Sequence, residues 1–262
     1  MSSKRPNPNP SNLTSKLHTN LLRLTQITST PTGLDATLAT ICYTSLLLHT
    51  QLRSKPPALK TLYTTFEDHR ILTRLLGLLP LYASIAEARQ TQHRDPIVKT
   101  LVYASLAAGT AFQALENVAV LVQRGTLRGR KWGEWEGWCW VVSCRFWLAQ
   151  LVLELGRLAR VRQLGWREEL GAEGLEGKGL EGKGEEREGV EVWSGRGQVE
   201  VQSARLARKW WRELYVTAAS VPLAVHWSFE EERSPVSEVL FAGMGLISGL
   251  IGLQDAWDEA AV

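Results

Sequence analysis

The side chains able to do catalytic or metal chemistry are few and scattered in this sequence. Its five histidines, at positions 18, 49, 69, 93 and 226, show no spacing typical of a catalytic or metal motif. The segment Glu67-Asp68-His69 could form one corner of a metal site, but a solvated helix face explains the same residues. There is no Walker A motif, no Gly-x-Gly-x-x-Gly after a strand, no His-Glu-x-x-His and no Gly-x-Ser-x-Gly elbow. We therefore expect no catalytic residue, no metal, no cofactor and no enzyme activity.

The three cysteines also argue against a covalent or metal framework. Cys42, Cys139 and Cys144 are odd in number and have no repeated spacing, which is unlike a disulfide scaffold. No histidine lies near Cys139 and Cys144 to complete a zinc site. We expect all three to be reduced and to pack as small apolar side chains.

The overall composition allows membrane contact only in a few segments. Hydrophobic residues make up 44% of the 262 residues, and the mean hydropathy is −0.12, well below that of a multi-span transporter. The net charge of +3 suits an anionic membrane surface and is too weak to indicate nucleic acid. Eleven tryptophans are many for this length, and Trp favours membrane interfaces as well as protein cores.

Five of these tryptophans gather near a basic turn that spans residues 124–131. They are Trp132, Trp135, Trp138, Trp140 and Trp147. Alternating basic and aromatic residues can stack single-stranded nucleic acid. However, the stretch 138–153 is mostly apolar with Arg145 as its single charge, which suits a helix at or in a membrane. We therefore expect no nucleic-acid partner.

Nearly every periodic segment predicts helix, so the fold class is expected to be all-α and membrane-associated. Residues 12–29 carry a narrow apolar stripe of Leu13, Leu17, Leu21, Leu24 and Thr28, and the first acidic residue of the chain is Asp35. Asp95-Pro96 signals the start of a long apolar helix. The predicted organisation is a polar N-terminal segment with a short helix (1–33), a helical membrane-associated region (34–165), a flexible Gly/Glu-rich linker (166–204) and C-terminal membrane-anchoring helices (205–262).

The last segment is the strongest candidate for a membrane span. Residues 235–254 are long enough to cross a bilayer core of about 30 Å as a helix. Gly245, Gly249 and Gly252 would weaken a soluble helix, but in lipid they allow close helix packing. With residues 214–229 it would form a transmembrane hairpin. A shallow interfacial helix at 214–229, or a soluble bundle that buries the last helix, stays open.

The second element of interest is an amphipathic helix predicted over residues 66–82. One broad face collects the aliphatic side chains of Ile71, Leu72, Leu75, Leu76, Leu78 and Leu79. Arg70 and Arg74 lie on the opposite, polar face. Such a helix can insert into one leaflet to about 5–10 Å and favour curvature. A soluble helix with a core-facing apolar side explains the same pattern.

Several stretches together resemble the peroxin-11 (peroxisomal biogenesis factor 11) family. They are Val221-Pro222-Leu223-Ala224-Val225-His226-Trp227 with the Gly-rich segment that ends Gly-Leu-Gln-Asp-Ala-Trp, then Ser143-Cys144-Arg145-Phe146-Trp147-Leu148, then residues 70–81, and residues 35–48. The chain is most similar to the gamma-like branch of the family. Its amphipathic helix is less basic than is usual there, and the linker looks like an insertion.

The resemblance implies a function at the peroxisomal membrane. The family elongates peroxisomes before fission, so it implies a peroxisomal membrane protein that drives peroxisome proliferation, with both termini facing the cytosol. It implies self-association, contact with peroxisomal membrane lipids, and cooperation with the dynamin-type fission machinery. The family's membrane-deforming helix corresponds to Arg70, Ile71, Leu72, Arg74, Leu75, Leu76 and Leu79. The alternatives are pore-like transport, which some members are linked to, and a soluble helical scaffold.

Overall fold

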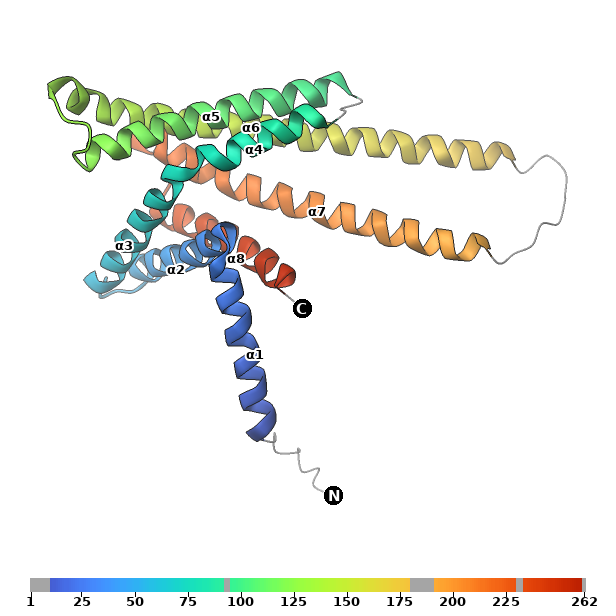
Figure 1. Ribbon diagram of the computed structural model, residues 1–262, viewed down its shortest axis with the longest axis horizontal. Coiled ribbons are helices and arrows are strands. Elements are labelled where there is room, and N and C mark those ends of the chain that lie inside the picture. Colours follow the sequence, from blue (N-terminus) through green and yellow to red (C-terminus); the bar gives the residue numbers. More distant parts are fainter. Residues whose placement is uncertain (1–9, 92–94, 180–190, 230–232, 261–262) are drawn as a thin grey trace. The chain divides into compact units, whose positions relative to one another are not determined.

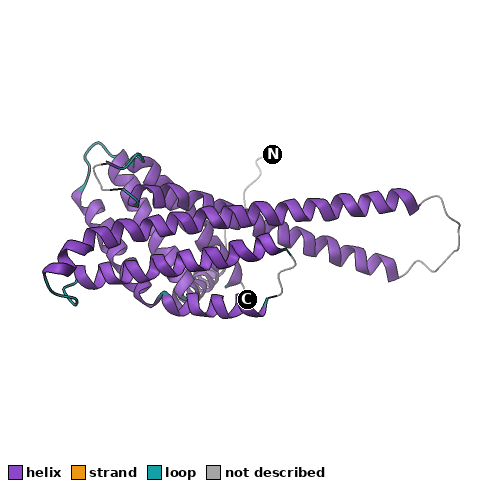
Figure 2. Cartoon of the chain, turned by 90° about the horizontal axis from the view of Figure 1, so that it is seen from above, coloured by secondary structure: helices purple, strands orange, loops and turns teal. Residues whose placement is uncertain are grey.

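Helices make up all the regular structure in the described part of the chain. The computed structural model describes residues 10–91, 95–179, 191–229 and 233–260, with side-chain surroundings for 14–91, 95–165, 205–229 and 233–260. The elements are α1 (Pro10–Ser29), α2 (Pro31–Gln51), α3 (Pro57–Thr73), the 3₁₀ turn η1 (Arg74–Leu76), α4 (Leu78–Gln90), α5 (Pro96–Gln123), α6 (Arg130–Gly179), α7 (Glu191–Trp227) and α8 (Glu238–Glu259) (Figure 1). No strand occurs within those ranges (Figure 2), which confirms the all-α prediction.

Two of the helices begin with a side-chain cap followed by proline, and the sequence predicts the one at Asp95-Pro96. The side chain of Asp95 accepts a hydrogen bond from the backbone N–H of Val98 at 2.9 Å, and Pro96 follows in the first helical position of α5. At the start of α2, Thr30 accepts from the N–H of Gly33 at 3.1 Å, and Pro31 follows in the same way. The backbone N–H groups of the first helical turn have no acceptor within the helix. In both cases the cap side chain accepts a hydrogen bond from one of them, and proline occupies the first helical position, where an N–H would have no partner.

The chain divides into two compact units, and the first joins the two ends of the sequence. It comprises the residues up to Arg70 and those from Glu238 onward. Within it, α8 packs along α2 in the antiparallel direction. A Cβ atom on Gly245 would lie 2.5 Å from the ring of Tyr43, and one on Gly249 would lie 3.0 Å from the backbone nitrogen of Thr40. Glycine is therefore required for this close approach.

The second unit, residues 71–237, is built on an antiparallel pair formed by α5 and α6. Phe112 of α5 stacks on Trp147 of α6, with ring centroids 5.9 Å apart. At the far end of the pair, Arg160 forms an ion pair with Asp95 at 2.7 Å. The third helix, α7, returns along α6, where the indole N–H of Trp210 donates to the carbonyl of Leu158 at 2.9 Å.

Three helices in the described residues are long and apolar enough to cross a membrane. They are Pro96–Gln123, Arg130–Gly165 and Glu238–Glu259. The last of these agrees with the predicted C-terminal span. Residues 214–229, the other half of the predicted hairpin, lie mostly in α7, which is not among the candidate spans in the described part. The apolar partner along which α8 packs is α2.

The predicted linker, residues 166–204, is only partly covered by the structure. Helix α6 continues to Gly179 and α7 begins at Glu191, so both ends of that range are helical. Its centre, residues 180–190, lies outside the described residues. A flexible linker therefore remains a prediction for the centre of this segment.

The glycine contacts between α2 and α8 can be tested by adding methyl groups. We expect Gly245→Ala with Gly249→Ala to lower the thermal unfolding temperature of the protein in nanodiscs. The overpacking cost of about 1–3 kcal/mol per site exceeds the gain in helix propensity of about 1 kcal/mol. Gly243→Ala is the matched control, because no atom lies within 4 Å of its added Cβ, and it should leave the unfolding temperature unchanged or raised. Equal behaviour of the two variants would contradict this packing.

Candidate functional site

The predicted amphipathic helix over 66–82 is broken at its centre. Helix α3 ends at Thr73, η1 covers Arg74–Leu76, and α4 begins after Gly77. The segments on either side differ in direction by 48°. The predicted amphipathic helix is therefore not continuous: Pro80 indicates a kink, and the break lies a few residues before it. One cause is Pro80, which has no N–H to donate to the carbonyl of Leu76, four residues earlier.

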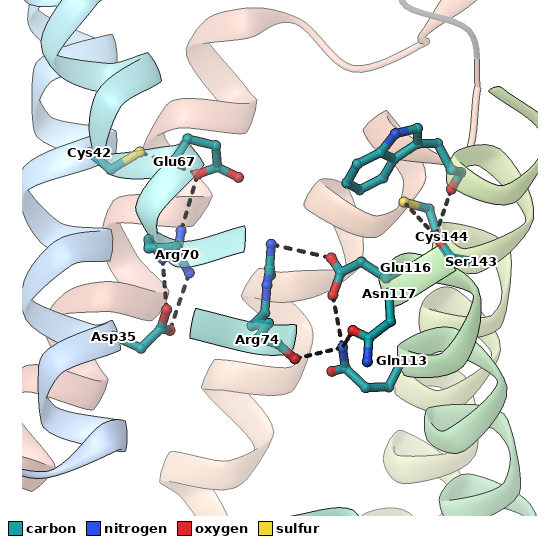
Figure 3. A network of polar contacts seen from close by, with 11 residues as sticks. Asp35, Cys42, Glu67, Arg70, Arg74, Gln113, Glu116, Asn117, Ser143 and Cys144 are labelled. Atoms are coloured by element: carbon teal, nitrogen blue, oxygen red, sulfur yellow. Dashed lines mark hydrogen bonds and ion pairs between the residues drawn. The ribbon is translucent and has the colours of Figure 1, made fainter. Parts of the chain in front are cut away.

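A second cause of the break is a pair of amide side chains on α5. Gln113 donates from Nε2 to the carbonyl of Arg74 at 2.9 Å. One turn along α5, Asn117 donates from Nδ2 to the carbonyl of Leu75 at 3.0 Å. The two amides are themselves joined, since Nε2 of Gln113 lies 2.8 Å from Oδ1 of Asn117 (Figure 3). These contacts satisfy carbonyl groups that a broken helix would leave without partners.

An ion pair fixes the same break to α5. A guanidinium nitrogen of Arg74 lies 3.3 Å from Oε1 of Glu116, whose side chain is almost fully buried. A buried carboxylate is costly unless it is paired and hydrogen-bonded, and here Gln113 adds a contact to its other oxygen at 3.3 Å (Figure 3). At Gly77, an added Cβ would collide with the side chain of Gln113. Glycine therefore lets the bend approach α5 closely.

The other arginine of the segment, Arg70, is buried and forms ion pairs within the first unit. Arg70 is 9% exposed; it forms an ion pair with Asp35 at 2.9 Å and a longer one with Glu67 at 3.4 Å. Its guanidinium also lies over the ring of Tyr43, 5.5 Å from the centroid. Little of the Arg70 side chain is therefore left to meet a membrane surface. A helical wheel cannot show that its partner lies 35 residues away.

Several leucines around the break remain at the surface of the folded chain. Leu76 is 70% exposed and Leu79 is 68% exposed. The other large apolar side chains exposed between residues 70 and 82 are Leu72, Leu78 and Tyr82. By contrast, Ile71 and Leu75 are half-buried, so the predicted apolar set splits into two groups. Exposed leucines this close together in a folded protein indicate a surface that meets a partner or a membrane.

Aromatic side chains are exposed at the start of α6. Trp132, Trp135 and Trp138 are all exposed, and the last two lie 5.8 Å apart between ring centroids. They follow the basic turn at 124–131, which carries no acidic residue. The helix begins at Arg130, before the apolar stretch 138–153 that suits a helix in the sequence. Tryptophan beside basic residues at the end of an apolar helix is typical of a membrane interface.

The three cysteines are free and buried. The thiol of Cys42 lies 3.4 Å from an oxygen of Glu67, and burial together with that carboxylate raises the pKa of Cys42 well above its usual range. A protonated, buried thiol is a poor nucleophile.

The sequence interpretation missed the residues that hold the break. Gln113, Glu116 and Asn117 recur at helical spacing in a segment that is otherwise apolar and long enough to cross a membrane. Polar residues in such a helix usually face a protein partner or a functional site. That pattern could have identified them, although it does not name the partner.

The role of the two amides can be tested by removing their donors. We expect Gln113→Leu with Asn117→Leu to speed hydrogen exchange of the amides at 74–79, because each orphaned carbonyl costs about 1–3 kcal/mol. Gln90→Leu is the control, since that side chain is exposed at the end of α4. Exchange that is equally slow in both variants would show that the break does not depend on α5.

One comparison with known proteins identifies the family of the chain. A family model described as peroxisomal biogenesis factor 11 (PEX11) matches residues 21–257. No curated protein and no solved structure matches the chain significantly. Peroxisomal biogenesis factor 11 proteins are associated with the peroxisomal membrane and act in peroxisome biogenesis and proliferation; they are not a known enzyme family. Since the match includes the break, the candidate spans and the Trp-rich start of α6, the chain belongs to the peroxisomal biogenesis factor 11 family.

Proposed function

We propose that this protein elongates the peroxisomal membrane before fission by placing the exposed leucines of residues 72–82 in its cytosolic leaflet. The observation that carries this proposal is that Leu76 and Leu79 stay about two-thirds exposed while the backbone beside them is fixed by α5. Family membership supports the site of action and the role in peroxisome proliferation. Apolar helices such as α5, α6 and α8 would anchor the chain.

The physical basis of the proposed insertion is apolar transfer. Moving a leucine side chain from water to an apolar environment gains about 1.5–3 kcal/mol when burial is complete. Residues that enter one leaflet to about 5–10 Å expand that leaflet and favour curvature. Because Arg70 and Arg74 are paired with carboxylates, they would position the segment and contribute little to the attraction of anionic lipids.

The bend gives the inserted residues a fixed support. A free amphipathic helix that adsorbs to lipid can roll or leave the surface. Here the carbonyls of Arg74 and Leu75 are held by α5, which is itself a candidate span. An inserted segment that is rigidly joined to an anchor would transmit its wedge shape to the bilayer more effectively.

We also propose that the chain self-associates and works with the dynamin-type fission machinery. Many copies are needed to bend a membrane over a large area, since each inserted segment expands the leaflet only locally. In this proposal, release of the protein by alkaline carbonate would favour a soluble scaffold, and solute-selective leak from reconstituted vesicles would favour a pore.

The wedge role is tested by charging the exposed leucines. We expect Leu76→Asp with Leu79→Asp to abolish tubulation of liposomes by the reconstituted full chain, because a carboxylate will not enter the leaflet. Folding should survive, since both side chains are exposed. Leu206→Asp is the matched control, because Leu206 is 64% exposed on α7. Tubulation by the double variant at the level of the control would refute the wedge.

The orientation of the termini is tested by protease digestion of intact peroxisomes. If both termini face the cytosol, the chain must cross the membrane an even number of times. The described residues contain three straight candidate spans, so in this proposal two of them cross the membrane while residues 72–82 stay in one leaflet. We expect tags at both termini to be digested, and a third tag in the turn at 124–131 reports whether α5 crosses. Protection of one terminal tag alone would overturn the proposed orientation.

A further inference from the structure

The turn that joins α5 to α6 concentrates positive charge at one end of the second unit (Figure 1). Its cations are Arg124, Arg128, Arg130 and Lys131, and all four are exposed. The sequence has no acidic residue between Glu116 and Glu134. Glu134 lies 3.2 Å from Arg130, but both side chains of this ion pair are exposed, and such pairs contribute little. The turn is therefore a surface suited to a ligand that carries several negative charges.

The backbone of this turn has a fixed shape. Gly125 and Gly129 have φ angles of +72° and +131°, which glycine adopts without strain. The N–H of Thr126 donates to the carbonyl of Leu121 at 2.9 Å, which closes the end of α5. The guanidinium of Arg128 folds back over the turn, and its Nε donates to the carbonyl of Gly125 at 2.7 Å. The backbone that carries the cations is thus ordered before a ligand binds, which lowers the entropy cost of binding.

We propose that this turn binds the headgroup of a phosphoinositide, a lipid that carries phosphate monoesters on an inositol ring. Arg128 and Arg130 contact the phosphates, because a guanidinium can pair with two oxygens at once, and Lys131 adds a point charge. Clusters of about four to eight cations next to a membrane helix are typical of proteins that bind anionic lipids, phosphoinositides among them. The inference rests on the proposed anchoring of the chain by α5 and α6, and not on insertion of residues 72–82.

The spacing of aromatic and basic residues along α6 places the turn at the depth of the headgroups. The helix rises about 9 Å from Trp132 to Trp138, close to the layer of about 5–8 Å between the apolar core of a bilayer and water. From Trp138 to Arg157 it rises about 28 Å, which matches the thickness of that core. The sequence between these two residues has two charges, Arg145 and Glu154, and Glu154 pairs with Arg157. When α6 crosses the bilayer, the turn therefore lies among phosphates.

A lipid fits this surface better than an acidic protein segment does. Trp135 and Trp138 are exposed beside the cations, with their ring centroids 5.8 Å apart, and exposed tryptophan is also common in protein interfaces. However, the turn connects two helices that are both candidate spans. Headgroups then surround it on every side, so that a lipid reaches it by diffusion in the plane of the membrane. A protein partner would first have to displace those headgroups.

The experiment uses the full chain in nanodiscs of phosphatidylcholine with phosphatidylinositol 4-phosphate or, at the same total charge, phosphatidylserine. Native mass spectrometry counts the lipids that stay bound to the released chain. We expect a preference of about tenfold for the phosphoinositide, and Arg128→Gln with Lys131→Gln should remove most of it, because each cation contributes about a fivefold gain in affinity for an anionic surface. Arg205→Gln with Lys209→Gln removes the same charge from exposed residues of α7, and this control should keep the preference.

Equal retention of the two lipids, or an equal loss in both double variants, would overturn the headgroup site. A fluorophore on Thr126→Cys measures the depth of the turn, since the three native thiols are buried. We expect quenching by nitroxide at the lipid headgroups; quenching by iodide alone would overturn both the site and the anchoring by α5 and α6. Loss of the lipid preference with headgroup quenching intact would overturn the site alone. Leu76→Asp with Leu79→Asp should keep the preference even if tubulation is lost, so that the wedge and the headgroup site fail separately.

Discussion

A buried carboxylate on an apolar helix is the constraint on which the second unit depends. Glu116 lies on α5, a helix long and apolar enough to span a membrane, and it is 4% exposed. Neither lipid nor a packed protein interior tolerates that charge without a partner. Arg74 supplies the partner, and Gln113 and Asn117 bind the adjacent carbonyls. The break between α3 and α4 is therefore a consequence of how α5 satisfies its polar residues.

This constraint changes which part of the segment is available to a membrane. An amphipathic helix is usually expected to offer its cations to lipid headgroups and its leucines to the acyl chains. Here the folded protein uses Arg70 and Arg74 internally, through Asp35 and Glu116. What remains at the surface is mainly apolar, led by Leu76 and Leu79 in the described residues. Any affinity of this segment for lipid would then vary with lipid packing more than with salt.

Helix type and several boundaries follow from the sequence, but the break and its contacts do not. Local signals suffice for the start of α5 at Asp95-Pro96 and for the apolar character of α8. The position of the break depends on side chains that come from α5, about 40 residues away, and Pro80 alone predicts only a weaker kink. Likewise, the glycines of α8 predict a close helix partner but do not identify it as α2. Residues 214–229 seemed the natural partner from proximity in sequence alone.

The face of α8 that α2 does not cover indicates whether this helix is surrounded by water or by lipid. Gly245 and Gly249 contact α2, and such close packing would serve a soluble bundle as well as a membrane protein. The opposite face carries Leu240, Ile247 and Leu250, all of them exposed, with Gly243 between them in open space. A helix that is apolar on both faces has no side suited to water. Lipid would surround the exposed aliphatic side chains with an apolar environment and would still permit the glycine contact with α2. A position inside the bilayer therefore explains both faces of α8.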